Sequence, residues 1–149
     1  TLAKGLANGV PIGAMLTREE IARVLGPGTH ASTFGGTPFV TSVALATLQT
    51  VIGEKIPERA AAMGRHLMDG LRALGKTSAA VRAVWGRGLL IGVELDRPAG
   101  PIVDACREAG LLVLTAGERV LRLTPPLIVG RDDCDRALAI IGRALGPKA

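Results

Sequence analysis

The sequence predicts an α/β protein in which helices pack against a sheet. Hydrophobic residues make up 48% of the 149 residues but aromatic residues only 2%, so the core must be built mainly from Leu, Val, Ile and Ala. A chain of this length can bury a sizeable core. After residue 52, helical patterns alternate with strand patterns, which is typical of helices layered on a sheet.

The first 25 residues combine a glycine-rich stretch with a short helical pattern. Residues 1–14 contain too many glycines for a stable helix, and the Val-Pro-Ile-Gly run within them predicts loop and short strand. Residues 17–25 predict one short helix, with Thr17 as its N-cap and Glu20 completing a capping box. The whole part of the chain before residue 52 is loop-rich and is not expected to be self-sufficient.

Two longer helices are predicted next. Residues 29–38 form a loop by composition, and the apolar segment 39–52 has approximately helical spacing. The clearest helix of the sequence begins near residue 56, with Pro57 in its first turn and Gly75 just past its end. Its apolar residues recur at intervals of three and four positions: Ile56, Ala60, Met63, Leu67, Leu71 and Leu74.

From residue 81 the pattern changes to strands with a helix between them. VRAVWGRGLLIGVEL (residues 81–95) predicts one buried strand, or two short strands around Gly86 and Gly88. The next helix has Pro101 in its first turn and Gly110 at its end. Its inner face is expected to carry Ile102, Cys106 and Ala109.

Two strands and a helix complete the chain. LLVLTA (residues 111–116) and RVLRLTPP (residues 119–126) predict strands joined by a turn. Residues 132–145 predict a final helix, whose acidic first residues favour its positive N-terminus. Its inward-facing residues are expected to be Cys134, Leu138, Ile141 and Leu145. The order of elements after residue 52 predicts a compact α+β unit of about 95 residues.

Charge and cysteine usage exclude several classes of function. The net charge is +5, but the basic residues are scattered, and with no Tyr, one Trp and two Phe the chain lacks the stacking residues of a nucleic-acid binder. No run of about 18 apolar residues is present to span a membrane. Cys106 and Cys134 have no metal-binding spacing and are expected to be buried free thiols. We therefore expect a cytoplasmic protein that binds neither nucleic acid nor membrane nor metal.

Lys4 raises the first question of function, because it lies among glycine and apolar residues with no acidic partner nearby. A lysine amine at its ordinary pKa is almost wholly protonated, and a cramped apolar setting lowers that pKa. Such an amine can attack an aldehyde, which is the requirement for a Schiff base with a carbonyl substrate or with pyridoxal phosphate. The alternative is a surface lysine whose stem covers apolar neighbours.

A second candidate is the loop THASTFGGTP, residues 29–38. Ser32 and Thr33 offer adjacent hydroxyls, and two following glycines let backbone N–H groups approach an anion just before a helix begins. Hydroxyls and amides at the start of a helix bind phosphate well. The alternative is a glycine-rich turn with an ordinary N-cap.

Three stretches together resemble the class III (fold-type I) pyridoxal-phosphate aminotransferases. TLAKGLANGVPIGA (residues 1–14) is similar to the active-site lysine segment of that family, which usually has KGLGGG followed by PIGA. PGTHASTFGGTP (residues 27–38) is similar to the family's HGSTFGGNP loop, and VLRLTPPLIV (residues 120–129) to its RLAPPL strand end. The stretches occur in the right order and spacing, so the resemblance covers essentially the whole chain.

The chain departs from the family's usual pattern at a few positions. Ala7 and Asn8 replace two glycines after the lysine. Ala31 replaces the glycine that follows the histidine of the loop, and Thr37 replaces the usual asparagine. None of these changes removes a reacting group, although Asn8 and Ala31 are expected to tighten the loops.

The resemblance implies a domain organisation and a place in a longer protein. Residues 1–50 would be the tail of the large α/β cofactor domain, and residues 51–149 the small C-terminal α+β domain of fold type I. The family's remaining cofactor-binding groups precede the lysine. The sequence opens on Thr1 and on the lysine segment, so we expect a fragment of something longer.

The resemblance also implies roles for individual residues. Lys4 would form the covalent link to pyridoxal 5'-phosphate and later move a proton between substrate and cofactor. Thr33, with Ser32 beside it, would bind the cofactor phosphate of the neighbouring subunit across a homodimer interface. Arg122 would bind a substrate carboxylate, a role that suits the planar guanidinium, and its alternative is a surface ion pair on a strand. Trp85 is expected to pack the small domain without a catalytic role.

Within the family the resemblance points to enzymes that move an amino group from N-acetylornithine to 2-oxoglutarate in arginine biosynthesis. The expected route is ping-pong, with small-molecule amino acid and 2-oxo acid substrates. Ornithine, 4-aminobutyrate and succinyldiaminopimelate remain open as amino donors. A non-catalytic fragment that serves only in folding or dimerisation is the alternative of a different class.

Overall fold

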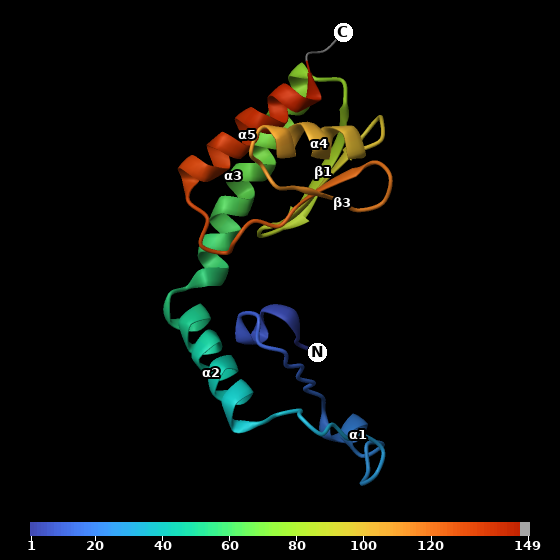
Figure 1. Cartoon of the computed structure of the whole chain (residues 1–149), viewed down its shortest axis with the longest axis vertical. Coiled ribbons are helices and arrows are strands. Elements are labelled where there is room, and N and C mark those ends of the chain that lie inside the picture. Colours follow the sequence, from blue (N-terminus) through green and yellow to red (C-terminus); the bar gives the residue numbers. More distant parts are fainter. Residues whose placement is uncertain (147–149) are drawn as a thin grey trace. The chain divides into compact units, whose positions relative to one another are not determined.

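The computed structural model describes residues 1–146 and separates into two compact units, Thr1–Lys55 and Ile56–Ala149 (Figure 1). The last three residues of the second unit lie outside the described part. The boundary expected between residues 50 and 51 falls inside the helix α2, Pro38–Gly53. The assignment of the two units to a large and a small domain remains a prediction.

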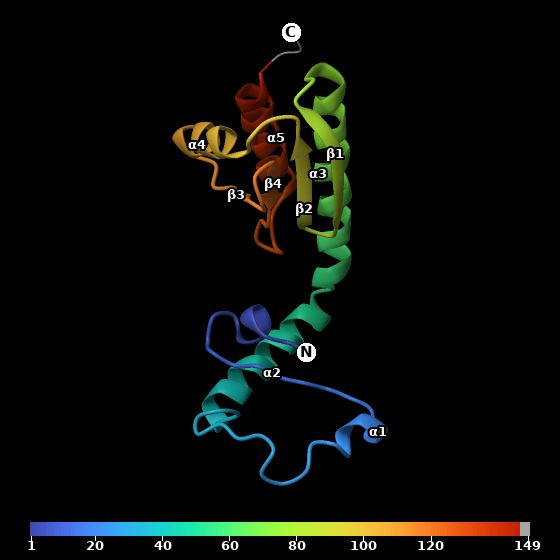
Figure 2. The same cartoon turned by 90° about the vertical axis from the view of Figure 1, so that its right-hand side faces the viewer.

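Apart from the helix α2, the first unit contains little regular structure (Figure 2). A 3-10 turn, η1 (Lys4–Ala7), lies in the stretch expected to be loop and short strand, and Leu2 forms an isolated antiparallel bridge with Ala14. The short helix α1 (Glu19–Ala22) is present. Its N-cap is Arg18, which makes no side-chain cap, so the predicted capping box at Thr17 and Glu20 was wrong.

The helix α2 was predicted correctly, but the first unit buries few of its apolar side chains. Its core consists of Leu6, Ala7 and Ala44, with Val10, Ile12, Ala14 and Val43 packed against them. Phe39 and Ile52, on α2, remain 69% and 75% exposed. The cluster is sufficient to hold η1 against α2, and it leaves most of the apolar surface of α2 uncovered.

The second unit has the mixed α and β order that the sequence predicts. The segment 81–95 forms two strands rather than one. Ala109, expected on the inner face of a helix, is the exposed C-cap residue, and Gly75 lies inside its helix instead of past it. The elements are α3 (Ile56–Thr77), β1 (Val81–Arg87), β2 (Leu90–Leu95), α4 (Gly100–Glu108), β3 (Leu114–Thr115), β4 (Val120–Leu123) and α5 (Arg131–Leu145).

The four strands of this unit form one antiparallel sheet in the order β1-β2-β4-β3. Successive side chains of a strand point to opposite faces. Val93 of β2 pairs with Val84 of β1 and with Leu121 of β4, and this row faces the core. The neighbouring row, one position along, therefore lies on the opposite face.

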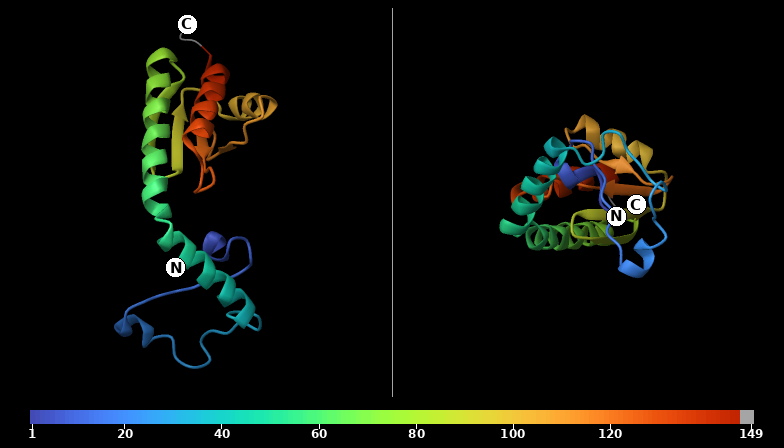
Figure 3. Two further views of the ribbon diagram at one scale, coloured as in Figure 1. Left: turned by 90° about the vertical axis from the view of Figure 1, so that its left-hand side faces the viewer. Right: turned by 90° about the horizontal axis from the view of Figure 1, so that it is seen from below.

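The helices α3, α4 and α5 supply the rest of the core (Figures 2 and 3). Helix α3 packs against β1, β2 and α5, and α4 packs against α5 and β3. The predicted apolar face of α3 is largely buried, with Leu71 fully so. The close approach of α3 to the β1–β2 turn depends on Gly64, because a Cβ there would collide with the carbonyl oxygen of Gly88.

Both cysteines are buried free thiols, as predicted. Burial raises the pKa of Cys106 and of Cys134, and for Cys134 the neighbouring carboxylates Asp135 and Asp133 raise it further. Within residues 1–146, no group of three or more His, Cys, Asp or Glu side chains gathers to hold a metal ion. No helix of that part of the chain is both long and apolar enough to cross a membrane.

Candidate functional site

Lys4 has an unusual backbone conformation. Its φ is 53°, in the left-handed region that costs energy for residues other than glycine. Lys4 is the first residue of η1. Leu6 and Ala7 of the same turn are buried in the small core against Ala44 of α2. This packing holds the turn in place and so keeps Lys4 in its strained conformation.

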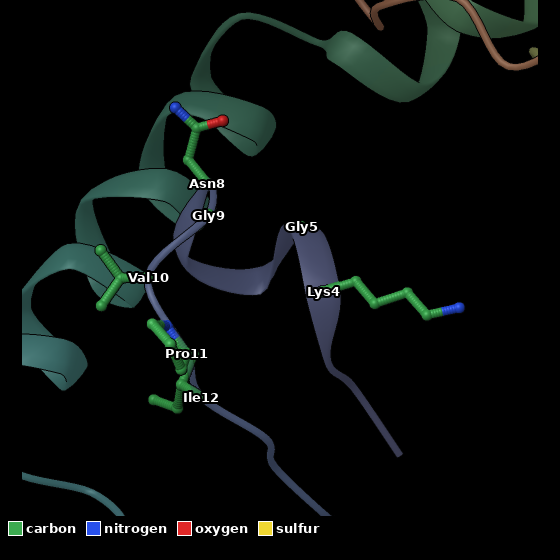
Figure 4. Close-up of a pocket in the computed structure, with 7 residues that line it drawn as sticks. All are labelled: Lys4, Gly5, Asn8, Gly9, Val10, Pro11 and Ile12. Atoms are coloured by element: carbon green, nitrogen blue, oxygen red, sulfur yellow. The ribbon is translucent and has the colours of Figure 1, made fainter.

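The amine of Lys4 is exposed (Figure 4). The side chain extends away from Asn8 and Val10, and the shallow hollow beside it has a volume of about 650 Å³ and is lined by Lys4, Gly5 and residues 8–12. The sequence predicted a cramped apolar setting for this amine. Residues 1–146 do not supply that enclosure on their own.

Asn8 shows how the lysine turn accommodates a departure from the family's glycines. It caps η1 with a φ of 48°, again in the left-handed region, and its backbone N–H donates to the carbonyl oxygen of Gly5. Asparagine tolerates this region better than most residues. The turn is therefore formed without a glycine at position 8.

Ser32 and Thr33 lie in the exposed loop that leads into α2. A Cβ on Gly35 would lie 2.8 Å from both Cβ and Oγ of Ser32, so the loop folds back tightly only because residue 35 is glycine. Thr37 is the N-cap of α2, and its side chain makes no capping hydrogen bond. Among residues 1–146, no side-chain hydrogen bond is formed by Ser32 or Thr33, and both precede the N-terminus of α2, where backbone amides favour an anion.

Arg122 is on β4, between β2 and β3, and is partly buried. Its Nε atom is buried and has no hydrogen-bond partner among residues 1–146. None of the ion pairs formed within those residues involves Arg122. A buried donor without a partner is costly, so the guanidinium is suited to receive a carboxylate.

The four residues expected from the sequence are divided between the two compact units. Lys4, Ser32 and Thr33 belong to the first unit, but neither hydroxyl residue lines the hollow beside Lys4. Arg122 belongs to the second unit.

The sequence did not indicate that Trp85 lies in the same row of paired residues as Arg122, with Gly92 between them. Trp85 is 47% exposed, and its indole lies over Gly92, so it packs on the outer face of the sheet rather than in the core. The alternation of side chains along β1 could have predicted the face of the sheet on which Trp85 lies. Its neighbours on the other strands could not be predicted, because they depend on strand pairing.

Comparison with known proteins places the chain in a family. The family model described as "Aminotransferase class-III" matches residues 1–145. Acetylornithine aminotransferase from Methanothermobacter thermautotrophicus is 41% identical over 145 residues, covering 97% of this chain and 37% of that protein. The chain belongs to the class III aminotransferase family.

Solved structures agree with this placement. Ornithine aminotransferase from Toxoplasma gondii, whose active site is partly occupied by pyridoxal phosphate, superimposes with a TM-score of 0.86 at 34% identity, over 94% of this chain and 34% of that one. A pyridoxal-phosphate-bound amine transaminase from an uncultivated Pseudomonas species superimposes with a TM-score of 0.85 at 32% identity, over 96% of this chain and 37% of that one. The fold is that of these aminotransferases, and the chain spans little more than a third of the length of such relatives.

Proposed function

We propose that this chain is the C-terminal part of a pyridoxal-phosphate-dependent aminotransferase. The observation that carries the proposal is the strained, anchored conformation of Lys4, in the segment that resembles the cofactor-lysine segment of the family. Strain held in place by surrounding packing is typical of functional residues. Membership of the class III family supports the same reading.

The residues present fit parts of the cofactor. Lys4 offers an accessible amine for the aldehyde, and Ser32 and Thr33 offer hydroxyl donors for the phosphate beside the N-terminus of α2. When bound, pyridoxal phosphate supplies the aldehyde that condenses with amines and a ring that withdraws electrons from the substrate. Pyridine-nitrogen and ring-stacking partners would come from the remainder of the longer protein.

The chain's own residues would then divide the work between proton movement and orientation. The Lys4 amine would take a proton from the amino-bearing carbon of the substrate and deliver it to the cofactor. Arg122 binds a substrate carboxylate through its planar guanidinium and so orients the reacting carbon. The Thr33 hydroxyl, and Ser32 beside it, hold the phosphate of the partner subunit's cofactor in a homodimer.

We infer that the amino donor is N-acetylornithine and the acceptor 2-oxoglutarate, as part of arginine biosynthesis in the cytoplasm. The support is the similarity to an acetylornithine aminotransferase at 41% identity. Ornithine is the second candidate donor, because an ornithine aminotransferase is also among the similar proteins. 4-Aminobutyrate and succinyldiaminopimelate follow as further donors of the same class.

One labelling experiment tests the role of Lys4. The complete protein is mixed with pyridoxal phosphate, reduced with borohydride and digested, and the modified peptide is mapped by mass spectrometry. We expect the label on Lys4. A label confined to other lysines, such as Lys55 or Lys76, would contradict the proposal.

A donor screen tests the substrate. The complete protein is given 2-oxoglutarate and each candidate amine in turn, and glutamate formation is measured. We expect the highest kcat/KM with N-acetylornithine. A clear preference for ornithine would support the proposed aminotransferase activity but would refute N-acetylornithine as its amino donor.

A further inference from the structure

One row of residues crosses the sheet on the face opposite the core. Trp85 of β1 pairs with Gly92 of β2, and Gly92 pairs with Arg122 of β4. The rows on either side of it contain Val93 with Leu121, and Ile91 with Leu123, all of which are buried in the core. The tryptophan and the arginine therefore lie on the same outer face, separated by a single residue that has no side chain.

The indole of Trp85 fills the space that Gly92 leaves. A Cβ on Gly92 would lie 2.9 Å from Cε2 and 3.0 Å from Cζ2 of Trp85. The ring therefore extends from β1 across β2, toward the strand that carries Arg122. Because directly paired residues have Cβ atoms about 5 Å apart, the stem of Arg122 begins immediately beyond the ring.

Arg122 is well placed to use such a neighbour. Its Nε is buried without a hydrogen-bond partner among residues 1–146, so water is already excluded from part of the guanidinium. The only residue between it and Trp85 in the row is Gly92, and on the other side it pairs with Leu114, which is 52% exposed. The described neighbours in this row are thus an indole and an aliphatic side chain.

We propose that Trp85 is a positioning residue for Arg122. The indole forms a wall beside the guanidinium that limits its rotamers and removes water from one side, which strengthens its binding of a substrate carboxylate. An arginine next to an indole is also favoured electrostatically. This inference rests on the proposed role of Arg122 in carboxylate binding and adds a residue that acts through it.

The first test compares kinetic constants of the complete protein. Trp85→Ala should raise the KM for 2-oxoglutarate about three- to tenfold and change kcat by less than about twofold. Trp85→Phe, which keeps a smaller aromatic wall, should give an intermediate KM. Leu90→Ala is the matched control. Leu90 is an exposed apolar residue of the same hairpin, but it pairs with Arg87 and so lies outside the row of Trp85, Gly92 and Arg122. We expect no change in KM from the control.

The second test uses the glycine. Gly92→Ala should push the indole away and raise the KM for 2-oxoglutarate in the native background, but it should add little in the Trp85→Ala background, where the space is empty. Equal effects of Gly92→Ala in both backgrounds would overturn the proposal. Thermal unfolding of each variant shows whether it is folded. If Trp85→Ala does not fold, the KM of Trp85→Phe is used to test the positioning role instead.

A double variant separates this inference from the proposed function. In the Arg122→Lys background, where the planar guanidinium is absent, Trp85→Ala should change KM by less than about twofold. A native protein without amino transfer would refute the proposed function. The positioning role alone would be refuted if the native protein transfers amino groups normally but Trp85→Ala leaves KM unchanged. It would also be refuted if Trp85→Ala changes KM equally in the native and the Arg122→Lys backgrounds.

Discussion

Lys4 and Lys55 are both exposed lysines in the left-handed region, with φ of 53° and 52°, but for different reasons. Lys55 follows the end of α2, where helices commonly continue into a left-handed residue. Lys4 starts a 3-10 turn and follows Ala3, whose backbone is extended rather than helical. The conformation of Lys4 therefore needs a reason outside ordinary helix capping, and its proposed role as the cofactor lysine would provide one.

This contrast supplies a matched pair of substitutions. Lys4→Arg in the complete protein should lower amino transfer by at least about a thousandfold, because the guanidinium neither condenses with an aldehyde nor releases its proton. Lys55→Arg should leave the rate within about twofold of the native value. Steady-state glutamate formation measures both. Undiminished transfer by Lys4→Arg would refute its catalytic role.

The buried thiols predict how stability depends on pH. Because burial raises the pKa of Cys106 and Cys134 above the ordinary value of a thiol, the unfolded chain loses thiol protons at a lower pH than the folded chain does. Their contribution to stability is complete below the unfolded pKa and is lost as the pH rises through the folded value. Urea unfolding should show a decline in stability above about pH 9 that is smaller in the double variant C106S/C134S. An equal decline in both proteins would assign it to other groups.

At the scale of elements, the packing of α3 against the hairpin depends on the absence of one side chain. Gly64→Ala places a Cβ against the backbone carbonyl of Gly88, which has no rotamer with which to move away. We expect a loss of about 2–3 kcal/mol in the free energy of unfolding. The measurement is urea unfolding followed by the fluorescence of Trp85, the one tryptophan of the chain.

Gly70 provides the control on the same helix. A Cβ there would meet the methyl groups of Leu138, which can rotate, and alanine also favours the helix over glycine by about 1 kcal/mol. Gly70→Ala should therefore cost less than about 1 kcal/mol. A larger loss from Gly70→Ala than from Gly64→Ala would contradict the packing described for α3.

At the scale of the whole molecule, the two units differ in how completely they bury their apolar residues. The core of the first unit has three buried members, Leu6, Ala7 and Ala44. The second unit has an extended core that joins the sheet to its three helices. Apolar side chains such as Leu16, Val24 and Phe34 remain 74%, 73% and 83% exposed in the first unit. We infer that only the second unit is stable by itself.

Limited proteolysis tests this difference. Trypsin should first cleave at the exposed Arg18 and Arg23, and a fragment that begins near residue 56 should persist. Mass spectrometry of the early digest identifies the sites. Initial cleavage within β1, at Arg82 or Arg87, would show that the hairpin opens before the first unit does.

The chain of 149 residues is also expected to lack ordinary transaminase activity by itself. The amine of Lys4 is exposed, and the hollow beside it is lined by one short stretch of chain, so neither the cofactor ring nor the substrate would be enclosed. Glutamate formation by the purified chain should remain at the level of the Lys4→Arg variant. Turnover of acetylornithine at an ordinary rate would refute this expectation.

Most helices could be predicted from the sequence because their signals are local. The three- and four-residue spacing of α3 and the acidic start of α5 are readable from neighbouring positions. The prediction of a capping box for α1 was wrong. Thr17 is a suitable N-cap residue type, but the N-cap of α1 is Arg18. The spacing of residues 39–52 predicted the helix α2 but did not show that apolar residues such as Phe39 and Ile52 remain exposed.

The candidate site was predicted in part for the same reason. Lys4, Ser32, Thr33 and Arg122 were found because short stretches of sequence carry recognisable patterns, and their roles remain predictions. The enclosure expected around Lys4 could not be judged from composition, because apolar neighbours in the sequence can point elsewhere in space. Leu6 and Ala7 pack against α2 and leave the amine exposed.

Apart from the number of strands in residues 81–95, the sequence by itself determined the order of helices and strands in the second unit, the buried state of both cysteines and the segments that carry the candidate residues. Each of these depends on residue types and spacings within a few positions. Only the tertiary structure decided that Trp85, Gly92 and Arg122 form one row and that Lys4 adopts a left-handed backbone. Strand order and register join residues far apart in the chain, and the strain at Lys4 is maintained by packing against α2, so neither can be read from local sequence.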